Sequence, residues 1–121
     1  MDLVVDYIRD AGNLDKERIV FKAEHNTQLG QFLIAETYVM GDSRFSSKIQ
    51  NLFWFPDMEL KIGDRVILYT KSGERNESSN EDGTKNYFFY WNLEESHLKG
   101  EKPCVVLLNA SWKAYVVTKE S

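Results

Sequence analysis

The chain has 121 residues, a formal net charge of −4, and 42% hydrophobic and 13% aromatic residues. This size and composition predict one globular domain over residues 1–121, with enough apolar mass to form its own core. The acidic balance and the scattered Lys and Arg argue against nucleic acid as a partner, because such binding rests on clustered positive charge. The longest apolar runs, residues 51–55 and 104–108, are too short to cross a membrane.

The first residues of the chain and its single cysteine, Cys104, indicate the compartment in which the protein is found. Residues 1–6 lack the basic start and uninterrupted apolar stretch of a signal peptide. One cysteine cannot form an internal disulfide, which is typical of a reducing compartment. We therefore expect a cytoplasmic protein, either cellular or viral.

Short strand-like runs separated by polar turns dominate the pattern. The expected strands, in chain order, are residues 3–9, 18–24, 29–39, 51–55, 65–71, 87–91, 104–108 and 112–118. A helix competes over residues 29–39, but Gly30 and the β-branched Ile34, Thr37 and Val39 favour a strand. Roughly eight strands with few helices indicate an all-β sandwich or barrel.

The segments between these strands are predicted to be loops. Residues 40–48 form a polar loop, and residues 92–100 have room for a short helical turn. Residues 72–86 are the most disorder-prone, because they contain hardly any apolar side chains to offset their ordering entropy. No internal repeat or domain linker is evident.

A more specific pattern lies in the middle of the chain. Residues 53–56, Phe-Trp-Phe-Pro, precede Leu-Lys-Ile-Gly-Asp at 60–64 and Val-Ile-Leu at 66–68. Strand-like segments precede this pattern at 18–22 and 30–34, and further segments follow it at 90–91 and 105–109. Taken in this order, the segments resemble a lamin tail domain over residues 16–118. The resemblance implies an immunoglobulin-like antiparallel β-sandwich, and a free-standing bacterial or viral relative rather than a filament protein.

The end of the chain departs from that family. Late in the family's domains a second Trp, followed by an Asn-Gly-Asp type turn, is expected, whereas residues 97–102 here read His-Leu-Lys-Gly-Glu-Lys. The closing hairpin also lacks its glycine and has Asn-Ala-Ser at 109–111. These differences put the end of the domain in doubt more than its middle.

Nothing in the sequence assembles a catalytic, metal or cofactor site. His25 and His97 lie in polar turns, and Cys104 opens an apolar strand, as inert core cysteines do. The acidic run at 80–83 fails as a calcium loop, because Phe89 occupies the position of the closing Glu. Asp57 and Glu59 are interpreted as solvent-exposed acidic residues of a turn. We expect no enzyme activity, no metal and no cofactor, with an atypical catalytic site as the lowest-ranked alternative.

Aromatic residues give the one positive indication of function. If Phe53 and Phe55 point inward, the alternation of a strand places Trp54 on the other face. The expected strand at 87–91 has aromatic side chains on both faces, and only one face can point into the core. The side chains of the other face either pack elsewhere or are exposed for recognition. The candidate binding residues are Trp54, Tyr87, Phe89, Trp91 and Arg75.

Two functions follow from these residues. The first is a non-catalytic module that binds a protein partner, or itself, through aromatics and loops, with residues 112–118 as a strand that could pair with a second copy. The alternative is a sponge for a small molecule, nucleotide or carbohydrate, with loop cations as anion contacts. Those cations are Arg44, Lys48 and Arg75.

Overall fold

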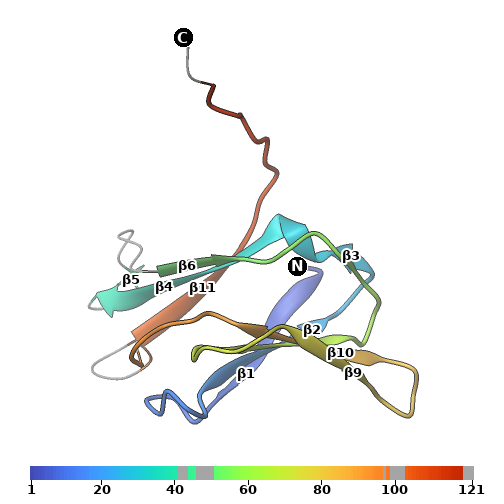
Figure 1. Ribbon diagram of the computed structural model, residues 1–121, viewed down its shortest axis with the longest axis horizontal. Helices are drawn as coiled ribbons and strands as arrows, with labels where there is room; N and C mark the ends of the chain where they lie inside the picture. Colours follow the sequence, from blue (N-terminus) through green and yellow to red (C-terminus); the bar gives the residue numbers. More distant parts are fainter. Residues whose placement is uncertain (41–43, 46–50, 97, 99–102, 119–121) are drawn as a thin grey trace.

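The computed structural model describes residues 1–40, 44–45, 51–96, 98 and 103–118. The described chain is all-β: its one helical element is a single 3-10 turn, η1, at Leu29–Gln31. Two layers of strands lie one above the other, and the chain leaves them through an extended C-terminal stretch (Figure 1). No helix in the described ranges has the length and apolar character needed to cross a membrane.

The larger sheet has five strands in the order β1-β2-β8-β10-β9. These are β1 (Leu3–Arg9), β2 (Arg18–Ala23), β8 (Arg65–Tyr69), β10 (Lys85–Tyr90) and β9 (Asn76–Ser79). All neighbours are antiparallel except β8 and β10, which run parallel. The sheet is therefore mixed, and the expectation of a purely antiparallel sandwich is wrong for this layer. The register of β1 against β2 shifts between Val5 and Tyr7, which makes the outer edge of β1 irregular.

The smaller sheet is built on β4 (Phe32–Met40), which pairs antiparallel with three strands. These are β11 (Pro103–Asn109), β6 (Asn51–Trp54) and the two-residue β5 (Arg44–Phe45). A separate ribbon joins β3 (Thr27–Gln28) to β7 (Glu59–Leu60). Neither sheet closes into a barrel.

Aromatic side chains from both sheets form the centre of the core. Phe55, just after β6, lies with its ring centroid 5.4 Å from that of Phe21 in β2 and 5.6 Å from that of Phe89 in β10, both edge to face. Phe53 packs in the same way on Trp91, at 6.0 Å. Such contacts add about 0.5–1.5 kcal/mol each beyond the apolar area they bury. They hold the two layers together at the point where β6 crosses the larger sheet.

The prediction of an all-β chain is confirmed, and seven of the eight expected strands have a counterpart in the structure. The expected strand at 112–118 is wrong: the described residues after β11 are extended but pair with no strand. The disorder expected for residues 72–86 is also corrected, because β9 forms there and pairs with β10. Described residues 92–96 and 98 contain no helical turn, and the rest of 92–100 lies outside the description.

Candidate functional site

Two tryptophans far apart in the sequence form an exposed pair at one end of the smaller sheet. Trp54 ends β6, and Trp112 follows β11; their ring centroids are 4.8 Å apart and their planes cross at 82°. Both indole N–H groups donate to one acceptor, the carbonyl oxygen of Gly30, at 2.8 and 3.0 Å. The two side chains remain 49% and 47% exposed, so the pair is fixed in place and still accessible.

The backbone at Gly30 is held from several directions, which fixes the shared acceptor. Its amide donates to Oε1 of Gln28, and that same oxygen accepts from the amide of Met58 at 2.7 Å. A Cβ atom at this position would lie 1.9 Å from Oδ1 of Asp57 and 3.0 Å from its Cα. A larger residue here would therefore force the side chain of Asp57 to move.

Two hollows flank Trp112. One, of about 250 Å³, lies between the tryptophan pair and the turn formed by Phe55, Pro56 and Asp57. The other, of about 340 Å³, is lined by Asp57 and Trp112 together with Gln28, Gln31 and Ser111. The exposed carboxylate of Asp57 is common to both, so the surface combines aromatic rings with one negative charge.

The residues predicted to form a recognition patch do not share one surface. Trp54 is exposed, but Phe89 and Trp91 are only 3% and 9% exposed and belong to the core. Tyr87 packs against that core, and its pKa is raised by burial and then by the nearby charge of Asp64. Arg75 stacks over the ring of Phe89, at 5.2 Å. Of the five, only Trp54 is part of the tryptophan pair.

The expected inward and outward alternation of the aromatic strand β6 is present. Phe55 is 1% exposed and Phe53 packs on the core, whereas Trp54 is half exposed. In β10 the outward Tyr90 stacks on Tyr69 of the parallel neighbour β8, with centroids 5.5 Å apart. The aromatic surplus is thus divided between the core, a stacked pair on the larger sheet and the tryptophan pair.

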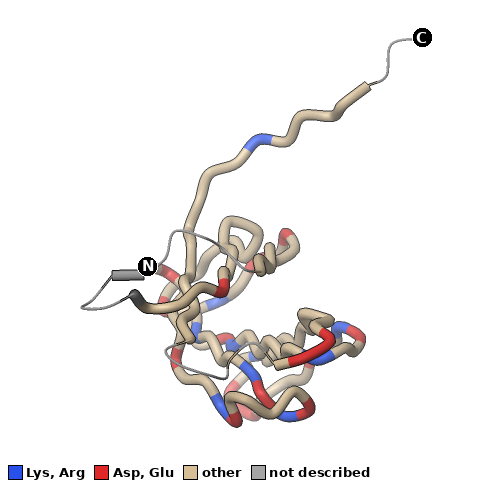
Figure 2. Tube along the Cα trace, turned by 90° about the vertical axis from the view of Figure 1, so that its left-hand side faces the viewer, with Lys and Arg blue, Asp and Glu red and all other residues tan. Residues whose placement is uncertain are grey.

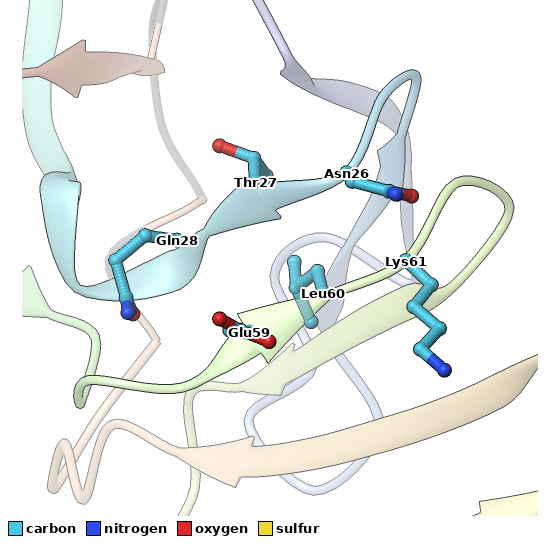
Figure 3. Close-up of a pocket in the computed structure, with 6 residues that line it drawn as sticks. All are labelled: Asn26, Thr27, Gln28, Glu59, Leu60 and Lys61. Atoms are coloured by element: carbon cyan, nitrogen blue, oxygen red, sulfur yellow. The ribbon is translucent and has the colours of Figure 1, made fainter.

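A further, polar hollow of about 350 Å³ lies at the β3–β7 ribbon (Figure 3). Thr27 and Gln28 line it from β3, and Glu59 and Leu60 from β7, with Asn26 and Lys61 at one end (Figure 3). Its amide oxygens already serve the backbone: Asn26 Oδ1 accepts from the amide of Ile62, and Gln28 Oε1 accepts from two amides. These side chains therefore stabilise the ribbon.

One buried carboxylate joins three segments of the fold. Glu17 is completely buried and accepts from the hydroxyl groups of Thr70, at 2.5 Å, and Ser96, at 2.6 Å. Its second oxygen also accepts from the amide of Gly12, at 2.8 Å. The nearest hydroxyl groups are themselves buried and donate to the carboxylate, so this cluster is a structural one.

The polar residues considered for catalysis or metal binding are scattered. His25 pairs with Asp2 at 3.2 Å on the surface, and Cys104 is partly buried in β11. Asp82 accepts from the hydroxyl and then the amide of Thr84, and these bonds lower its pKa. Across the described ranges no three His, Cys, Asp or Glu side chains converge on a metal-sized site. His97 and Lys48 lie outside the described residues, as does the side chain of Arg44.

No known protein family and no characterised protein matches this sequence. The resemblance to a lamin tail domain therefore stays a prediction. Trp112 is the site residue that the sequence does not reveal, because its local pattern predicts a strand and gives no sign of a contact with Trp54. The sequence gives no signal for Trp112 beyond the residue type, because the carbonyl oxygen of Gly30 that accepts its hydrogen bond lies 82 positions away.

Proposed function

We propose that this chain is a non-catalytic binding module that recognises a segment of another protein through the tryptophan pair, Trp54 and Trp112. The observation that carries the proposal is that both indole N–H groups are bound to one backbone oxygen while each ring stays about half exposed. With their polar groups satisfied, the rings offer apolar area that needs no further hydrogen bond. Rigid tryptophans of this kind dominate the energetics of protein interfaces.

The charge beside the pair specifies the partner further. Asp57 lines both hollows next to Trp112, and the chain as a whole has a net charge of −4. A cation near an aromatic face and a carboxylate is attracted by both. The partner that fits is a peptide segment with an apolar or aromatic side chain next to Lys or Arg.

The proposal also includes a finer assignment of the scaffold that carries this surface. We propose that the two layers correspond to an immunoglobulin-like sandwich related to the lamin tail domain. The aromatic core at Phe53 and Phe55 and the turn at Gly63, where φ is +89°, support this. Modules of this architecture commonly bind through loops and strand ends at one end of the sandwich, where the tryptophan pair lies.

Selection from a displayed peptide library tests the proposed function. The bait is the full chain, compared with Trp54→Ala and with Tyr7→Ala, an aromatic that is 41% exposed on β1 in the other sheet. We expect the wild type and the Tyr7→Ala variant to enrich the same apolar and basic peptides, and Trp54→Ala to lose at least tenfold in affinity for them. The Asp57→Asn variant should lose the preference for Lys and Arg and keep the apolar one.

Two results would overturn the proposal. One is enrichment that is the same for Trp54→Ala and wild type while circular dichroism shows both folded. The other is an absence of peptide enrichment together with thermal stabilisation by nucleotides or sugars, which would move the function to the small-molecule alternative. Stabilisation lost on substituting Asn26 or Lys61 would assign that ligand to the polar hollow of Figure 3.

A further inference from the structure

Residues 113–118, here called the C-terminal arm, have the character of a strand without a neighbour. They extend away from both sheets (Figure 1), and Tyr115, Val116 and Val117 are 79%, 88% and 93% exposed. Lys113 is the one charged position among them, seen as the single blue stretch on the arm in Figure 2. β-branched and aromatic residues of this kind favour strands, and leaving them in water forgoes the burial that would stabilise the fold.

The smaller sheet has an edge strand, β11, that is protected only by Pro103 at its start. β11 pairs only with β4 among the described strands, and its seven residues carry no charge. The two edges of the larger sheet are guarded: β1 by its register shift and by Asp6 and Arg9, and β9 by four exposed polar residues. A long uncharged edge strand readily pairs with a further strand.

The hydrogen-bond alternation shows which groups of β11 point outward. The amide of Ala110 donates to the carbonyl of Gln31, at 2.9 Å, so even-numbered residues of β11 bond to β4. On the other side of β4, the amide of Phe55 donates to Phe32, which agrees with this assignment. The backbone groups of Val105, Leu107 and Asn109 therefore face away from β4 and remain for another strand.

The arm of the same chain does not supply that strand. Trp112 is held by Trp54 of β6, and β6 pairs with the side of β4 opposite to β11. The chain thus crosses the end of β4 between Ala110 and Trp112, and the arm begins across β4 from the open edge. A hairpin back onto β11 would break both the ring contact and the bond of Trp112 to Gly30.

We propose that the C-terminal arm of one copy adds as a strand to the open edge of β11 in a second copy. The arm of six residues spans about 20 Å when extended, close to the length of β11, at about 3.3 Å per residue. It leaves the end of the sheet where β11 finishes, so two copies placed end to end exchange arms antiparallel to β11. The exchange is reciprocal and closes as a two-fold dimer. It does not depend on peptide binding by the tryptophan pair.

Sedimentation of the full chain over a range of concentrations tests this exchange. We expect the wild type to form a reversible dimer and Val117→Pro to stay monomeric at every concentration. In the register that places Thr118 beside Cys104, the amide of Val117 faces Val105 of β11, and proline removes this ladder donor and fixes φ. Val117→Thr, which keeps the β-branched shape, should still dimerise. Since residue 117 is 93% exposed, none of these changes affects the fold of the body. A wild type that is monomeric to about 1 mM, or a Val117→Pro variant that dimerises equally, would overturn the proposal.

Cross-linking to the native Cys104 of β11 locates the arm. Antiparallel pairing places the far end of the arm beside Cys104, so Thr118→Cys should form an intermolecular disulfide under mild oxidant, and Ala114→Cys should not. Wild type and the Thr118→Cys/Cys104→Ser double variant are the controls and should remain unlinked. A disulfide within one chain would show that the arm folds onto its own β11, and no disulfide at any arm position would show that β11 is not the acceptor.

Discussion

Trp54 and Trp112 share one hydrogen-bond acceptor, the carbonyl oxygen of Gly30, and their rings meet edge to face at 4.8 Å. The relationship connects the end of β6 to the chain leaving β11 and so closes one end of the smaller sheet. It also determines where the C-terminal arm starts. One contact thus links the proposed recognition surface to the proposed exchange of arms, while each remains testable without the other.

Replacing Trp112 with Ala is expected to lower the free energy of unfolding by about 1–3 kcal/mol, through loss of one hydrogen bond and one aromatic contact. Urea denaturation at low protein concentration measures this. The matched Tyr7→Ala variant removes a comparably exposed aromatic and should cost under about 1 kcal/mol. Equal losses in the two variants would mean that the contact with Trp54 contributes little to stability.

Gly30→Ala is expected to displace the side chain of Asp57, since the new methyl group would lie 1.9 Å from Oδ1. The carboxylate is exposed and can rotate, so the cost is about 1 kcal/mol, at the low end for overpacking. Removing the obstacle in the Gly30→Ala/Asp57→Ala double variant should restore most of the lost stability. A cost unchanged in the double variant would place the strain in the backbone instead.

Glu17→Gln is expected to destabilise the fold by about 1–3 kcal/mol. The amide nitrogen of Gln would face a buried hydrogen-bond donor, which would lose the carboxylate oxygen that accepts its bond in the wild type. Thermal or urea unfolding measures the loss. Glu94→Gln makes the same chemical change at an exposed position and should alter stability by less than about 0.5 kcal/mol. If both variants unfold alike, the bonds to Thr70 and Ser96 are not important for stability.

The carboxylate of Asp82 is expected to titrate below its ordinary pKa of 3.8, because Thr84 donates to it from its hydroxyl and its amide. A folded-state pKa below the unfolded one stabilises the native state above the unfolded value, and this stabilisation is lost as the pH falls through the folded pKa. Carbon-detected NMR titration follows Asp82 directly. Thr84→Val should bring its pKa back toward the ordinary value, and no change would assign the shift to another cause.

The strands could be predicted wherever the hydrophobic pattern alternates along the chain. The packing of Phe53 and Phe55 against the core, with exposure of Trp54, follows from the two-residue period of a strand. β9 could not be found in this way, because Asn-Glu-Ser-Ser has no apolar face and is held only by pairing with β10. Its stability comes from the neighbouring strand and is not encoded locally.

The site could be predicted only in part, because its contacts join distant positions. The alternation of the strand predicts that Trp54 lies on the face opposite to Phe53 and Phe55, but its contact with Trp112 depends on how the chain crosses β4 after β11. Trp112 to Thr118 has every local property of a strand and yet pairs with none among the described residues. Whether such a segment pairs is decided by the edge that it reaches, and local propensity carries no information about that edge.

The most direct test of the recognition surface is an NMR titration of the wild type with a peptide recovered by display. The chain has three tryptophans, so its indole N–H signals are few and can be assigned by single substitutions. The proposed function predicts that the signals of Trp54 and Trp112 shift with saturation while that of the buried Trp91 stays in place. Binding that leaves the first two signals unmoved would contradict it and place the recognition surface elsewhere on the molecule.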